Sequence, residues 1–170
     1  MAAHVLVVAT VTAASDDLLA ALGERVRRAS VPVDFLLVMP ASGPEAAEEM
    51  KPRLDVVLAR WRDAGLKAEG LIGDSDPVNA VAEVWKPGRF DEVIVSTLPG
   101  QTSRWLRSDV PYRIGVLTDL PVTHVVAMSM AKPELHGEPP PRRERVPLGM
   151  LNVMAYRGNH PPEQGALKPW

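Results

Sequence analysis

Five short apolar runs recur between residues 4 and 127, separated by segments of helical or turn character. The first run, from His4 to Ala9, has no polar alternation, which is typical of a strand covered on both faces, as in a parallel sheet. Between the runs, apolar residues recur every three or four positions, which is the spacing of an amphipathic helix. The predicted strands are 4–9, 33–38, 67–72, 92–96 and 122–127.

The ends of the predicted helices are marked by capping residues. Ser15, followed by two aspartates, is a predicted N-cap of the first helix. Asp76 is predicted to cap the third helix, with Pro77 at its first position. The second helix, about 44–64, contains Pro52, which predicts either a kink or a start at that residue.

A fourth helical region, about 104–117, is expected to break near Asp109. Strands and helices then alternate with short connections, and right-handed crossovers give a doubly wound, five-stranded parallel sheet of order 3-2-1-4-5. In such Rossmann-like sheets ligands bind outside the carboxyl ends of the strands, where the strand order reverses. This rule predicts a pocket between Ala9–Thr12 and Ser96–Ser103.

Composition excludes several kinds of function. The net charge of −2 gives no general attraction to nucleic acid or to an anionic membrane. Without cysteine there is no disulfide or thiolate chemistry, and the four histidines share no metal-ligand spacing, so no metal is expected. No signal peptide or run of membrane-spanning length is seen, so we expect a cytoplasmic protein.

Prolines divide the chain into two predicted parts. Residues 1–127 are expected to form the α/β domain, and residues 128–170 a proline-rich C-terminal extension. The basic cluster at 142–145 lacks interleaved aromatic residues and is interpreted as part of a linker. The apolar segment 146–156 is predicted to dock on the domain or on a dimer partner.

The second half of the predicted domain resembles the universal stress proteins. The resemblance is carried by Asp91–Ser96, Pro99–Leu106 and Leu120–Val126, while Gly73–Pro77 resembles the turn after the third strand in that family. In order and spacing the similarity covers residues 4–127. It implies an adenine-nucleotide α-hydrolase-like fold and a site for ATP or another adenine nucleotide.

At the positions that match the family's phosphate-binding glycines, this chain has other residue types. Nucleotide-binding members carry Gly-x-x-Gly, nine residues, and then Gly-Ser or Gly-Thr. Laid onto this chain, these glycines fall on Ser96, Pro99 and Asp109. Proline has no N–H to donate, and an aspartate would place a carboxylate where a phosphate should lie. The predicted cleft is therefore altered, although Gly100, Ser103 and Arg104 offer another route to an anion site.

The candidate nucleotide-contacting residues lie at strand ends and in the loop after the fourth strand. They are Ala9, Thr10, Val11, Val38, Gly73, Asp74, Ser96, Thr97, Gly100, Ser103 and Arg104. No catalytic residue is assigned. Trp105, directly after the loop, is expected either to cover a bound base or, with more support, to pack beneath the fourth strand.

Three functions remain open from the sequence. The first is a non-enzymatic, universal-stress-like regulatory protein that forms a homodimer through Val122–Ala127, as the resemblance implies, with the C-terminal extension reinforcing it. The second is a protein-interaction module whose cleft is filled by side chains and binds no nucleotide. The third is a nucleotide hydrolase, which would need a base near the fourth strand, where Asp109 is the nearby acid.

Overall fold

The five apolar runs form one parallel sheet in the computed structural model, which describes residues 1–100 and 103–128. The strand order is β3-β2-β1-β4-β5 and every neighbouring pair is parallel, as the sequence predicts. The strands are β1 (Ala3–Val8), β2 (Val33–Pro40), β3 (Lys67–Gly73), β4 (Glu92–Thr97) and β5 (Val122–Val126).

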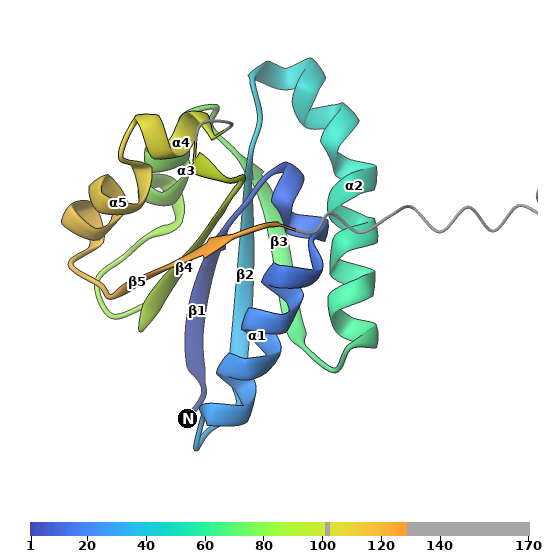
Figure 1. Ribbon diagram of the computed structural model, residues 1–170, viewed down its shortest axis with the longest axis vertical. Helices are drawn as coiled ribbons and strands as arrows, with labels where there is room; N and C mark the ends of the chain where they lie inside the picture. The colour runs from blue at the N-terminus through green and yellow to red at the C-terminus, as the bar shows by residue number, and fades with distance from the viewer. Residues whose placement is uncertain (101–102, 129–170) are drawn as a thin grey trace, which may run out of the picture. The chain divides into compact units, whose positions relative to one another are not determined.

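Helices cover both faces of the sheet, so the described residues form three layers. Figure 1 shows α1 and α2 on one side and α3, α4 and α5 on the other. The helical segments are η1 (Val11–Ala14), α1 (Asp16–Arg28), α2 (Gly43–Asp63), α3 (Pro77–Val84), α4 (Arg104–Arg107) and α5 (Val110–Thr118). The break between α4 and α5 occurs at Ser108 and Asp109, as expected.

Two apolar clusters hold the layers together. On one face, Trp61 of α2 and Leu22 of α1 are fully buried against alternate residues of the central strands, such as Val7. On the other face, Ile114 of α5 and Val81 of α3 pack on the opposite set of strand residues. Since both faces of β1 are buried from Val5 to Val8, this central strand needs an apolar residue at each of those positions, which explains its lack of alternation.

The predicted helix caps are present. The Ser15 hydroxyl accepts a hydrogen bond from Leu18 N at 3.1 Å, and Asp76 Oδ1 accepts one from Val78 N at 2.7 Å. Gly65, which follows the C-cap of α2, has a φ of +85°, a value that residues with a Cβ rarely adopt. These caps fix where the chain enters each helix and therefore where the connecting loops lie.

Two local features differ from the sequence-based predictions. Helix α2 begins at Gly43 and continues past Pro52, so the alternative of a late start at Pro52 is wrong. Figure 1 shows the first turns of α2 leaning away from the line of the rest, in keeping with the hydrogen bond that proline cannot donate. The short turn η1 between β1 and α1 was not predicted.

Within the described residues, no helix combines the length and apolar character needed to cross a bilayer. The predicted extension 128–170 lies outside the described residues except for Met128, so the docking of segment 146–156 stays a prediction. Met128 is tied to the domain by its N–H, which donates to Asp17 Oδ2 at 2.8 Å.

Candidate functional site

A cavity of about 560 Å³ opens at the carboxyl ends of β1 and β4, where the strand order reverses. This is the position that the topology rule predicts for a ligand. Hydroxyl-bearing side chains from five different segments predominate in its lining. The lining residues are Thr10, Val11, Thr12, Pro40, Ser42, Ser75, Asp76, Pro77, Ser96, Thr97, Leu98, Ser103, Arg104, Trp105, Ser108, Val110 and Arg113.

The end of β4 lies at the bottom of this cavity. Ser96 is only 1% exposed, and within the described residues its hydroxyl oxygen has no hydrogen-bond partner. A buried hydroxyl without a partner carries a free-energy penalty, which a polar ligand atom would remove. The Ser96 carbonyl, by contrast, accepts a hydrogen bond from Thr12 Oγ1 at 3.1 Å, which joins η1 to β4.

The neighbouring hydroxyl of Thr97 is already engaged. Its Oγ1 lies 2.7 Å from Nε2 of His124 on β5. Partial burial lowers the pKa of His124 below its usual value, because the charged imidazolium is less well hydrated there. Neutral His124 can therefore share one hydrogen bond with Thr97, which holds this side chain beside the cavity.

The loop after β1 forms the opposite wall through Thr10 and Val11, as predicted. Two other candidates, Ala9 and Val38, do not line the cavity, because both are fully buried. Their backbones meet instead, and Ala9 N donates to Val38 O at 3.3 Å. Ala9 directly follows β1 and Val38 lies within β2, so both residues belong to the buried sheet rather than to the cavity wall.

The turn between β3 and α3 reaches the cavity through residues other than those predicted. Gly73 and Asp74 do not line it. Asp74 Oδ1 accepts from Asp76 N at 2.8 Å, which fixes the turn that presents Ser75 and Asp76. Sequence reasoning assigned Asp76 a capping role only, although its position after the carboxyl end of a strand was a usable signal.

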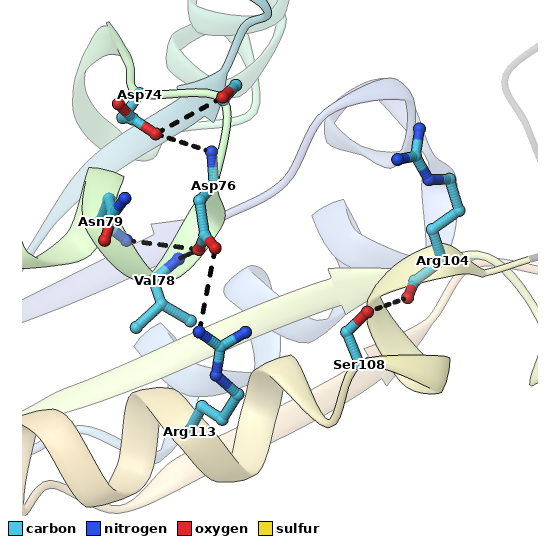
Figure 2. A network of polar contacts seen from close by, with 8 residues as sticks. Asp74, Asp76, Val78, Asn79, Arg104, Ser108 and Arg113 are labelled. Carbon is cyan, nitrogen blue, oxygen red and sulfur yellow. Dashed lines mark hydrogen bonds and ion pairs between the residues drawn. The ribbon is translucent and has the colours of Figure 1, made fainter.

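Two guanidinium groups border the cavity from the other side. Arg104 lies on α4, whose first residue follows Ser103, and the Ser103 hydroxyl accepts from Leu106 N at 3.3 Å. Arg113 lies on α5, and its Nη2 is 3.8 Å from Asp76 Oδ2. Figure 2 shows Asp76 between its capping contacts and Arg113, with the Arg104 guanidinium extending away from that network. Sequence reasoning identified Arg104 but missed Arg113.

Apolar side chains complete the cavity without filling it. Trp105 is half-buried, packs partly against the apolar cluster beneath it, and also lines the cavity. Trp105 therefore packs against the core, as one expectation has it, and it also borders the cavity, while its contact with a bound base stays a prediction. Leu98 lines the same cavity, which nevertheless keeps its volume of about 560 Å³.

The positions that correspond to the family's glycines do not all face the cavity. Pro99 and Gly100 are not among its lining residues. Asp109 is exposed, starts α5 with a φ of 49°, and does not line the cavity either. The acid that lines the cavity is instead Asp76, the N-cap residue of α3.

No metal-binding group of three or more His, Asp or Glu side chains occurs in residues 1–100 and 103–128. His4 lies at the other end of the sheet, with Nδ1 3.8 Å from Asp34 Oδ2, while His124 contacts Thr97. His136 and His160 lie outside the described residues. The described histidines therefore have separate polar neighbours rather than a shared centre.

Comparison with solved structures gives a match over most of the described chain. A universal stress protein from Archaeoglobus fulgidus superposes with a TM-score of 0.53 and 18% sequence identity, over 74% of this chain and 98% of that one. The chain has the fold of the universal stress proteins. No family model matches its sequence, and no curated protein matches it.

Two further structures of this fold were found at lower similarity. One is the Archaeoglobus fulgidus universal stress protein in complex with dAMP, with a TM-score of 0.48, 18% identity, and coverage of 74% of this chain and 98% of that one. The other is an Arabidopsis thaliana universal stress protein family protein with AMP bound, with a TM-score of 0.49, 16% identity, and coverage of 78% and 96%.

Proposed function

We propose that this chain is a universal stress protein-like, non-enzymatic regulatory protein of the cytoplasm. Its cleft at the ends of β1 and β4 binds an adenine nucleotide or a related phosphate ester. The observation that carries this proposal is the combination of Arg104, Arg113 and the unpartnered, buried Ser96 hydroxyl around one cavity. Guanidinium groups favour phosphate, and a buried hydroxyl gains from a polar ligand atom.

The volume of the cavity favours this function over a cleft filled by side chains. Trp105 and Leu98 are the side chains that would fill it, and both form part of its wall instead. A cavity of about 560 Å³ falls within the range of about 300–1,000 Å³ that is common for small-molecule sites. Binding of a ligand therefore needs no rearrangement of the apolar lining.

Binding rather than hydrolysis is proposed because of where the acids lie. Asp109, the base that a hydrolase would require in this region, is exposed and outside the cavity lining. Asp76 lines the cavity, but its Oδ1 accepts from the α3 N-terminus, and its Oδ2 faces the guanidinium of Arg113 at 3.8 Å. We therefore expect a bound nucleotide to be recovered intact after prolonged incubation, as judged by chromatography of the released ligand.

The first experiment is to denature the purified full chain and search for released nucleotide by mass spectrometry, followed by calorimetry with ATP, ADP, AMP and cyclic AMP. Arg104→Gln should weaken binding about tenfold, since a hydrogen bond to a charged group contributes about 1.5–3 kcal/mol. Arg107→Gln is the matched control, because Arg107 lies on the same helix but does not line the cavity. No bound nucleotide and no heat with any of the four would refute the proposal.

We further propose a homodimer through residues 122–127, which comprise the free edge of β5 and the residue that follows it. In the described residues β5 pairs with β4 alone, so its other edge has no strand beside it. Unpaired edges recruit further strands. Sedimentation equilibrium should give the mass of a dimer. Thr123→Lys, at an exposed position of β5, should lower the measured mass, whereas Val56→Lys, at an exposed position of α2, should leave it unchanged. A monomer at all concentrations would exclude this interface.

A further inference from the structure

Asp76 and Arg113 face the same cavity and carry opposite charges. They come from different elements, the start of α3 and the first turn of α5, and both belong to the cavity lining. Their closest atoms, Asp76 Oδ2 and Arg113 Nη2, are 3.8 Å apart, which is too long for a hydrogen bond. The two groups attract each other without saturating the donors of the guanidinium.

This pair contributes little to the stability of the fold. The two side chains are 39% and 48% exposed, and ion pairs with such exposure contribute between about 0 and 1 kcal/mol. In residues 1–100 and 103–128 the Arg113 side chain donates no hydrogen bond, so its donors remain available to a ligand in the cavity. The position of Arg113 is therefore better explained by binding than by packing.

The two oxygens of Asp76 have separate tasks. Oδ1 accepts from Val78 N at 2.7 Å and from Asn79 N at 3.4 Å, which caps α3. Oδ2 faces Arg113, as Figure 2 shows. Capping needs a side-chain oxygen but no charge, since asparagine and serine cap about as well as aspartate. The cap itself therefore does not require the negative charge of Asp76, although the dipole of α3 favours it, and this charge borders the cavity.

We propose that Arg113 binds the phosphate of the ligand and that Asp76 sets how much negative charge the cleft accepts. This inference rests on the proposed function above. Among the cavity-lining residues the charged groups are Arg104, Arg113 and Asp76, so the carboxylate offsets one of two cations. The repulsion between Asp76 and a ligand grows with each negative charge on the ligand. Asp76 therefore lowers the affinity for triphosphates more than the affinity for phosphate esters of low charge.

The test is the dependence of affinity on ligand charge, measured by calorimetry with cyclic AMP, AMP, ADP and ATP without added metal. Asp76→Asn keeps the cap and removes the charge. At low salt, Asp76→Asn should improve affinity about threefold for each negative charge on the ligand. This factor is expected in water when the removed carboxylate and a ligand charge lie about 6 Å apart. The gain should thus be smallest for cyclic AMP and largest for ATP, and should shrink at high salt.

Two control variants make the result interpretable. Asp55→Asn, at an exposed position of α2, changes the net charge by the same amount as Asp76→Asn and should leave every affinity unchanged. Arg113→Gln should weaken all four ligands about tenfold, as loss of a charged hydrogen bond predicts. An Asp76→Asn effect that is absent or equal for all four ligands, or an unchanged Arg113→Gln, overturns this inference while the proposed function stands. Wild-type protein that binds none of the four overturns both.

Discussion

Gly73 ends β3 at the point where the chain turns toward α3, and it has no room for a larger side chain. A Cβ at this position would lie 2.8 Å from Ala80 Cβ and 3.2 Å from Val38 Cγ1. Carbon atoms in contact prefer a separation of about 3.5–4.0 Å, so Gly73→Ala requires a shift of about 1 Å. Ala80 Cβ is fixed to the backbone of α3, and therefore the helix itself must move.

Such overpacking costs about 1–3 kcal/mol. For a protein of this size each 1 kcal/mol lowers Tm by about 2–4 °C, so Gly73→Ala should lower Tm by about 2–12 °C relative to the wild type. Urea unfolding followed by far-UV circular dichroism on the full chain gives the free energy directly. Since Asp76 caps α3 and lines the cavity, displacement of α3 should also weaken ligand binding.

Gly23→Ala is the matched comparison. Gly23 lies inside α1, and an added Cβ would meet only the flexible end of Arg27 at 3.5 Å. The same substitution should there stabilise the protein by about 0.5–1 kcal/mol, because alanine favours the helix. If Gly73→Ala proved as stable as the wild type while Gly23→Ala behaved as expected, the close packing of β3 against α3 would be refuted.

Three further predictions concern caps and protonation. Ser15→Ala should cost about 1 kcal/mol in urea unfolding, because the buried N–H of Leu18 loses its acceptor; an unchanged midpoint would contradict this. Asp76→Ala should cost about as much, whereas Asp76→Asn should stay within about 0.5 kcal/mol of the wild type; equal losses would show that charge, not capping, stabilises α3. The lowered pKa of His124 means that the unfolded chain binds its proton more readily, so this residue makes stability rise with pH between its folded pKa and the unfolded value of about 6.5. His124→Gln should flatten that rise in urea unfolding between about pH 5 and 7, and an unchanged pH slope would refute it.

The sheet could be predicted from sequence because its determinants are local. Uninterrupted apolar runs indicate strands buried on both faces, as β1 and β2 are, and a capped start such as Ser15 indicates where a helix follows. Alternation of the two then restricts the strand order to a few choices. The strand order 3-2-1-4-5, which the structure confirms, was sufficient to predict where the cavity lies, without any side-chain contact.

The contents of the cavity could be predicted only in part, because they depend on contacts between distant residues. Thr10, Ser96 and Arg104 follow strand ends or the loop that the topology indicates, and they line the cavity. Arg113 reaches it from the first turn of the chain's last described helix, and its partner Asp76 is 37 positions earlier. A periodic pattern shows that a helix has a polar side, but not which cavity that side borders.

The carboxylate that borders the cavity belongs to Asp76 and not to Asp109, and this difference changes how the site is interpreted. Alignment to the family motif placed an acid at Asp109, where it would block a phosphate directly. The structure leaves Asp109 exposed and brings Asp76 to the cavity instead, opposite Arg113. An acid paired with an arginine moderates the positive charge of a cleft without occupying the phosphate position. The position of Asp109 outside the cavity lining therefore removes one argument against phosphate binding, while the missing N–H of Pro99 remains a departure from the glycine motif.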